Sequence, residues 1–542
     1  MKKLSVLLLV LIFTALLFSG CATDSGIDDG DGDDVAPAEE MVLTFNVGTE
    51  PETMDVHLST GVPEATIMLQ IYDGLTRLNA ESIPELALAE SVDVSEDGLV
   101  YTFNLRDGLV YSNGDPLTAE DFVFSWKRAL DPELAADYAY MLYYIKGAEA
   151  YNTGEGSADD VMVEALDEKT LQVTLEAPTP FFMSLVAFKT YYPLHRATVE
   201  ADSEGWHLSA DTIIGNGPFK MVSWAQGQME FVPNENYWDK DAVILDRLVF
   251  TMVENESTEL TMFETGEIDF THTVPGQEIP RLEATGELKI LPYLGTYYYI
   301  FQVEKPPLDD INVRKALTMA IDREAIVTNV TQGGQLPAFA YVPPGIPEVD
   351  GSDFRANGGD YLTYDPEMAQ QLLAEAGYPG GEGFPAVEIL YNTSEMHKLV
   401  AEAIQEMWKQ NLGIENVTLT NQEWDVYLDT RDEGDFMIAR AGWIGDYLDP
   451  FTFLDMWVTD GGNNNSRFSN AEFDQLITEV RLGDDEVQRM AMMHQLEDIL
   501  MAEMPVCPIY YYTQPVMVKS YVKDYVSIAV GGIDFKSAYI EK

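Results

Sequence analysis

TAEDFVFSWKRALDP, residues 118–132, predicts a helix whose two ends are both marked in the sequence. The hydroxyl group of Thr118 can cap the first turn together with Asp121, and Pro132 cannot continue the helix. Apolar residues, among them Trp126, recur at helical spacing between these ends. One face of this helix is therefore predicted to be core rather than a binding site.

Strands are predicted on both sides of this helix along the chain. Residues 42–47, 101–105 and 171–176 alternate apolar and polar side chains, which is the period of half-buried strands. A second helix should begin at Pro366, and Gly377 should end it. Because no internal repeat interrupts this alternation, the sequence predicts α/β domains with mixed sheets.

The first 41 residues are predicted to lie outside the folded part. Two lysines, an apolar run and small residues before Cys21 indicate a lipoprotein signal peptide over residues 1–20. Cys21 is then lipidated and becomes the first residue of the mature chain; a plain secretory signal with a chance cysteine is the alternative. Residues 21–41 are acidic with almost nothing to bury, which predicts a flexible tether. We therefore expect an extracytoplasmic protein that is lipid-anchored to the cell membrane.

Composition excludes some classes of partner. The formal net charge of −61 argues strongly against nucleic-acid binding, because phosphate backbones repel an acidic surface. No segment after the leader is long and apolar enough to span a membrane.

Cys507 is the only cysteine besides Cys21, so no disulfide within the folded part is expected. Its strand-forming neighbours predict a core residue.

Motifs that mark enzymes are missing from the sequence. The six histidines do not fall at metal-ligand spacing, and there is neither a GxSxG elbow nor a Walker A loop. We therefore predict no catalytic residue, no metal and no cofactor. A secreted peptidase or glycosidase is the enzymatic alternative.

The segment ARAGWIGDY, residues 439–447, places a cation and a carboxylate close together, with two glycines between them. Arg440 offers a donor fork suited to a carboxylate, and Asp446 offers an acceptor suited to an ammonium group. Gly442 and Gly445 let a ligand backbone come close. The segment thus suits a zwitterion such as a free peptide, although two charges on a surface loop usually meet only water.

Eight segments occur in the order found in one known family. They are TAEDFVFSWKRALDP (118–132), GNGPFKMVSW with NENYWD (215–224 and 234–239), TGEIDF (265–270), YYYIFQVEKPPLDDINVRKALTMAIDRE (297–324), ILYNTSEMHK (389–398), NQEWDVYLDTR (421–431), ARAGWIGDY (439–447) and PIYYY (508–512). From residue 42 to its end, the chain resembles the oligopeptide-binding proteins of bacterial ABC importers, the extracytoplasmic solute-binding protein family 5.

The resemblance implies a two-lobed clamshell of the periplasmic-binding-protein type, class II, with mixed sheets and an extra domain inserted in the first lobe. The family layout assigns residues 42–72, 197–294 and 515–542 to lobe I, 73–196 to the inserted domain and 295–514 to lobe II. Two crossings of the chain between the lobes would form a hinge. The strand-like residues 297–303 and 510–518 are the expected crossings.

The resemblance also implies the site residues. In the family, an extended peptide lies between the lobes, with its backbone paired like an added strand. Carried over to this sequence, Asp446 holds the α-amino group with Arg440 beside it, while Arg431 and His397 meet the C-terminal carboxylate. The positions that line pockets are Trp424, Trp443, Tyr138, Tyr293, Asn392 and Tyr512, and those that supply backbone contacts are Gly442 and Val62.

Without the resemblance, His397 would be an ordinary solvated helix residue and the aromatic residues would be core. Arg431 would neutralise its aspartate neighbours.

Four positions depart from the family pattern. Gly295 and Ile444 stand where close relatives often carry a disulfide, and Thr331 and Thr60 stand where some relatives have a lysine and a glutamate. The preferred peptide length is therefore open, with longer peptides expected to bind better than short ones. The implied partners are an oligopeptide and the membrane subunits of an ABC importer, with the protein acting as a monomer. The same fold also serves dipeptides, nickel complexes, haem and oligosaccharides, which remain alternatives.

Overall fold

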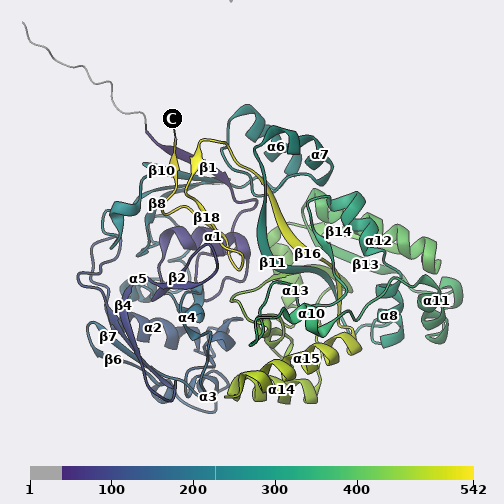
Figure 1. The fold of residues 1–542 in the computed structure, drawn as a ribbon, viewed down its shortest axis with the longest axis horizontal. Helices are drawn as coiled ribbons and strands as arrows, with labels where there is room; N and C mark the ends of the chain where they lie inside the picture. Colours follow the sequence, from purple (N-terminus) through teal and green to yellow (C-terminus); the bar gives the residue numbers. More distant parts are fainter. Residues whose placement is uncertain (1–39, 226, 542) are drawn as a thin grey trace, which may run out of the picture. The chain divides into compact units, whose positions relative to one another are not determined.

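The computed structural model describes residues 40–225 and 227–541. The predicted leader, Cys21 and nearly all of the tether lie outside these residues. Within the described part, no helix has both the length and the apolar content needed to cross a bilayer. From residue 41 onward, the described residues form one structural unit (Figure 1).

The first sheet contains the first strand of the chain and three later ones, in the order β1-β10-β9-β8. β1 runs parallel to β10, and the other neighbours are antiparallel. Leu43 and Phe45 are buried and alternate with partly exposed residues, as predicted for this strand. The strands are β1 (Val42–Asn46), β8 (Phe219–Ala225), β9 (Gln228–Pro233) and β10 (Arg247–Thr251). The helices of this region are α1 (Val62–Ile71), α5 (Arg196–Ala201), α6 (Glu256–Thr265) and α7 (Ile279–Leu282).

The second sheet is antiparallel throughout, in the order β4-β5-β7-β6, and α2 packs beside it. Its strands are β4 (Ala89–Val94), β5 (Val100–Leu105), β6 (Val163–Asp167) and β7 (Thr170–Thr174). The predicted capping box of α2 (Ala119–Ala129) is present, with the backbone N–H of Thr118 donating to Asp121 at 2.7 Å. Phe122 and Trp126 are fully buried, which confirms the predicted core face. The remaining elements here are β2 (Thr76–Leu78), β3 (Pro84–Leu86), α3 (Ala148–Asn152) and α4 (Phe182–Leu185).

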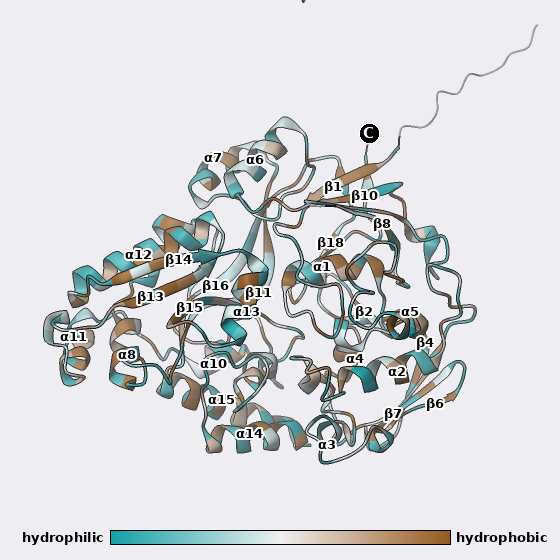
Figure 2. Cartoon of the chain, turned by 180° about the vertical axis from the view of Figure 1, so that it is seen from behind, coloured by the Kyte–Doolittle hydropathy of each residue, from teal (hydrophilic) through white to brown (hydrophobic). Residues whose placement is uncertain are grey.

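The third sheet has six strands in the order β12-β16-β11-β15-β13-β14. They are β11 (Leu288–Phe301), β12 (Leu336–Pro337), β13 (Val387–Asn392), β14 (Val417–Gln422), β15 (Ile438–Ile444) and β16 (Val506–Met517). Its helices are α8 (Ile311–Met319), α9 (Arg323–Ile326), α10 (Phe354–Gly358), α11 (Pro366–Glu375), α12 (Glu395–Leu412), α13 (Trp424–Asp432), α14 (Ala471–Leu482) and α15 (Glu486–Glu503). Helix α11 begins at Pro366 and is followed by Gly377, as predicted, and the side chain of Asp365 caps its first turn. Figure 2 shows β13 in the brown of apolar residues and teal polar stretches along α12.

Cys507 lies in β16 and is 1% exposed. Its sulfur accepts a hydrogen bond from Arg323 Nη2 at 3.7 Å. Within the described residues it is a free cysteine, so the prediction of a core thiol is confirmed.

Strands β11 and β16 pair with each other along most of their length and run side by side (Figure 1). The pairing is interrupted between Pro292 and Thr296. At one end, Val518 bridges Phe270, which in turn bridges Phe45 of the first sheet. The other end lies in the middle of the six-stranded sheet. The two strands therefore connect the region of the first sheet with the third.

The α/β clamshell class with mixed sheets is confirmed. The first sheet draws its strands from the segments assigned to lobe I, and the second lies within the predicted inserted domain. The third sheet is formed mainly by residues assigned to lobe II. The exact boundaries stay a prediction.

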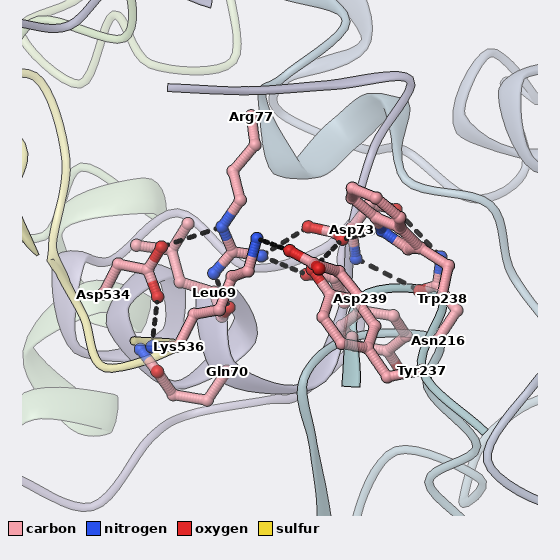
Figure 3. A network of polar contacts seen from close by, with 12 residues as sticks. Leu69, Gln70, Asp73, Arg77, Asn216, Tyr237, Trp238, Asp239, Asp534 and Lys536 are labelled. Atoms are coloured by element: carbon pink, nitrogen blue, oxygen red, sulfur yellow. Dashed lines mark hydrogen bonds and ion pairs between the residues drawn. The ribbon is translucent and has the colours of Figure 1, made fainter. Parts of the chain in front are cut away.

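A buried network of charges ties the C-terminal tail to the start of the chain (Figure 3). Arg77 pairs with Asp73 and, through Nε, donates to Asp534 at 2.8 Å. The side chains of Tyr237 and Trp238 donate to Asp73 Oδ2 at 2.7 and 3.0 Å. Segments far apart in sequence are thereby held together. The tail itself contains β17 (Val522–Lys523), β18 (Val526–Ser527), β19 (Ile533–Asp534) and β20 (Tyr539–Ile540).

Candidate functional site

The segment 439–447 forms strand β15 and the loop that follows it. β15 pairs with β11 on one side and β13 on the other, so it lies inside the six-stranded sheet. Successive side chains of a strand point to opposite faces, which places Arg440, Gly442 and Ile444 on one face. All three line a cavity.

This cavity has a volume of about 260 Å³. Small-molecule sites usually measure roughly 300–1,000 Å³, so it has room for a side chain or two rather than a whole peptide. One wall comes from residues that precede β11, and the other comes from the six-stranded sheet and the loops beside it. The predicted site residues that line it are Val62, Tyr293, Asn392, His397, Trp424, Arg440, Gly442 and Tyr512.

Arg440 is held by neutral groups. Its Nη1 donates to Asn392 Oδ1 at 3.2 Å and its Nη2 donates to the hydroxyl of Tyr512 at 2.7 Å. The guanidinium lies over the ring of Tyr297, 4.7 Å from the centroid. Its Nε is buried without a hydrogen-bond partner, and no described carboxylate forms an ion pair with it. A buried cation held only by dipoles and aromatic rings is a ready site for an anion.

His397 sits in the first turn of α12, as predicted. Its ring lies 5.5 Å from that of Tyr297, and Nδ1 is 3.4 Å from the hydroxyl of Tyr297. Burial and the charge of Arg440 lower the pKa of His397 well below its usual value. The imidazole is therefore neutral at physiological pH and can donate one hydrogen bond to a ligand.

Asp446 belongs to a second cluster next to this cavity, not to the lining of the cavity. It accepts hydrogen bonds from Thr452 Oγ1 at 3.2 Å and from the hydroxyl of Tyr138 at 3.4 Å. The rings of Tyr138 and Trp443 are stacked 6.1 Å apart. Burial raises the pKa of Asp446, while the charge of Lys189 opposes that rise. The structure thus brings two other predicted site residues, Tyr138 and Trp443, close to the buried carboxyl of Asp446.

Lys189 is a functional candidate that the sequence did not suggest. It is 5% exposed, donates to the backbone carbonyl of Ser59 at 2.6 Å and lies 4.3 Å from the ring centroid of Tyr138. Burial lowers its pKa, and the charges of Asp446 and Glu64 oppose that change. The only signal in the sequence was a lone lysine within the apolar run around residues 181–192.

Arg431 is not part of the cavity lining. It donates twice to Asn465 Oδ1, at 2.6 and 3.2 Å, and its guanidinium lies 5.5 Å from the ring centroid of Tyr427. Of the two groups predicted to meet a C-terminal carboxylate, only His397 faces the cavity; Arg440 stands beside it in place of Arg431.

The departures from the family pattern also have places in the structure. Gly295 and Ile444 are direct neighbours in the β11–β15 ladder, which agrees with a disulfide position in relatives. A β-carbon on Gly295 would lie 2.4 Å from Cδ1 of Ile444, so this pair could not be filled by two large side chains. Thr331 lines the cavity and is buried, whereas Thr60 is half-buried outside it.

Helices α6 and α12 meet at their N-termini, and each caps the other. One carboxylate oxygen of Glu256, in α6, accepts from Ser394 Oγ at 2.7 Å and from the N–H of Met396 at 3.1 Å. Glu395, in α12, accepts from the N–H and hydroxyl of Ser257 at 3.1 and 2.8 Å, and from the asparagine that caps α6. These contacts, called the reciprocal caps below, join the segment predicted as lobe I to the segment predicted as lobe II.

Comparison with known proteins decides the family. Residues 84–465 match the family model described as bacterial extracellular solute-binding proteins, family 5 Middle. The chain is 40% identical to the oligopeptide-binding protein OppA of Bacillus subtilis (strain 168), over 100% of both chains. The chain belongs to solute-binding protein family 5.

Solved structures of family 5 have the same fold. The Haemophilus influenzae OppA complex with RPPGFSPFR superposes with a TM-score of 0.86 at 33% identity, over 93% of this chain and 99% of that one. The Escherichia coli murein tripeptide-binding protein MppA gives 0.86 at 33% identity, over the same shares of the two chains. The unliganded open form of MppA gives only 0.60, at 32% identity over 93% and 98%. The fold of this chain therefore superposes well on the first MppA structure and poorly on the unliganded open form.

Proposed function

We propose that this protein captures oligopeptides outside the cytoplasm and delivers them to the membrane subunits of an ABC importer. It acts as a monomer, without catalysis, and is tethered to the cell membrane through a lipid on Cys21. Family membership and the printed names of its relatives support peptide capture. The leader sequence supports the tether.

The observation that carries the proposal is the state of Arg440. It faces a cavity, it is held by Asn392 and Tyr512, and it has no described carboxylate partner. Every peptide with a free C-terminus offers a carboxylate. We therefore assign the ligand's carboxylate to Arg440, with the neutral ring of His397 beside it, and the ligand's α-amino group to Asp446. The aromatic residues at Trp424 and Trp443 and the backbone near Gly442 and Val62 complete the site.

Lys189 should weaken the attraction of Asp446 for the α-amino group of a ligand. Its ammonium group already compensates part of the charge of Asp446, so the α-amino group of a ligand adds to an existing pair instead of meeting a lone carboxylate. We expect the carboxylate end of the ligand to be recognised more strongly than its amino end.

Isothermal titration calorimetry with a matched pair of peptides tests this function. A free C-terminal carboxylate should bind tenfold to hundredfold more tightly than the amide of the same peptide, because a charged hydrogen bond is worth about 1.5–3 kcal/mol. Arg440→Met should remove the difference, and Arg440→Lys, which keeps the charge, should retain part of it. Equal affinities of the two peptides for the wild type would refute the assignment.

A further inference from the structure

Among the described residues, the cavity wall that precedes β11 carries three carboxyl groups and neither a lysine nor an arginine. Glu254, Glu256 and Glu259 line it. The neighbouring charges that act on Glu256 and Glu259 are those of other carboxylates, not of any described lysine or arginine. Burial raises the pKa of Glu256 to about 7 and that of Glu259 to about 8. This wall would therefore be stabilised by a cation.

Glu256 has one oxygen without a hydrogen-bond partner. Its Oε1 is occupied by the reciprocal cap to Ser394 and Met396. Its Oε2 is buried without a hydrogen-bond partner, and the whole residue is 4% exposed. A buried carboxylate oxygen left unpaired costs free energy, and a donor from a ligand in the cavity would remove that cost.

The opposite wall carries the complementary charge. Arg440 is the one lysine or arginine among the residues that line the cavity. Both histidines of the lining are neutral, because burial lowers the pKa of His272 to about 4 and that of His397 well below its usual value. The lining thus has a cationic group on one wall and acidic groups on the other. The lining also contains apolar side chains such as Val253 and Met396, against which an alkyl chain can pack.

We propose that the cavity is a subsite for a lysine or arginine residue at the carboxyl end of the bound peptide. The α-carboxylate of that residue meets Arg440, and its side-chain cation meets Oε2 of Glu256, with Glu254 nearby in the same wall. This proposal rests on the proposed function. It also makes Glu256 touch both the ligand and the first turn of α12.

Peptides of one length and sequence that end in lysine or in norleucine test the proposal, because the two residues differ in charge but share an alkyl chain. By calorimetry, the wild type should bind the lysine peptide at least tenfold more tightly. The ratio of the affinity for the lysine peptide to that for the norleucine peptide should fall close to one in Glu256→Gln. It should also fall, by less, in Glu254→Gln, which changes a half-buried position. Glu395→Gln is the matched control, since it weakens the reciprocal caps without touching the cavity; both affinities should fall and the ratio should stay.

A ratio near one in the wild type would overturn the proposal while leaving peptide capture intact. The same holds if the ratio survives in both Glu256→Gln and Glu254→Gln. A second pair with lysine or norleucine at the amino end separates the subsite from the general acidity of the protein. An equal preference for lysine at either end would overturn the subsite. If neither peptide of a pair binds at all, the proposed function fails instead.

Discussion

Replacing Glu395 by alanine should weaken ligand binding without touching the ligand. The side chain makes its hydrogen bonds to Ser257 and to the asparagine cap of α6, on the far side of the predicted cleft from its own helix. Capping contacts of this kind are worth about 0.5–2 kcal/mol. The negative charge of Glu395 also stabilises the N-terminus of its own helix α12 by about 0.3–1 kcal/mol. This contribution is the same in the open and closed forms, so it cancels from the closing equilibrium.

The closing equilibrium should therefore shift by about 0.5–2 kcal/mol, or a factor of about 2–30. Where the open form dominates the ligand-free protein, the Kd of any peptide rises by the same factor. Calorimetry with one peptide gives the change in Kd, and small-angle scattering should show that more ligand is needed for contraction. Glu406→Ala is the control, because that residue lies on the same helix and its hydrogen bond stays within the helix. If Glu395→Ala binds peptide as tightly as Glu406→Ala, the reciprocal caps do not stabilise the closed form.

Three further outcomes are expected. Acetylating the α-amino group of a peptide should weaken binding, and Asp446→Asn should reduce that difference; equal affinities of both peptides for the wild type would contradict the role of Asp446. Glu259→Gln should flatten the pH dependence of stability: burial raises the pKa of Glu259 from 4.5 to about 8, so the folded protein holds a proton that the unfolded chain releases, and stability falls as pH rises through this range. Thermal melts of the ligand-free protein at both ends of the range check this, and an equal loss in the variant would contradict it. Tetrapeptides should bind tenfold to hundredfold more tightly than tripeptides of the same residue type, and Thr331→Lys should narrow the gap; calorimetry that shows tripeptides binding best, with no effect of Thr331→Lys, would contradict the inference.

Local features were predictable from the sequence because they depend on near neighbours in the chain. The capping box of Thr118 and Asp121 needs only a spacing of three residues, and the structure has it. The burial of Cys507 follows from its apolar strand. The cavity position of Arg440 was also predicted, but only because the resemblance to a family supplied the tertiary context for a loop-like motif.

Contacts between distant segments were not predictable. Lys189 approaches Asp446 across more than 250 residues of chain, and nothing in the residues around either position encodes that meeting. The reciprocal caps of Glu256 and Glu395 depend in the same way on how two helices are brought end to end. Arg431 does not line the cavity and contacts Asn465, so its predicted contact with a ligand carboxylate stays a prediction.

The pairing of β11 with β16 has a mechanical consequence. The two links between the predicted lobes are neighbouring strands joined by ladder hydrogen bonds, so neither can twist without the other. The pairing between β11 and β16 is interrupted at residues 293–295, although Leu294 is bonded there to Ala529 and Gly445, and we expect the two strands to bend at this break in their pairing. Opening then becomes a rotation about one axis that crosses both strands at this level. The opening rotation is then described by one angle. A single distance between two labelled positions, one in each predicted lobe, is enough to follow it.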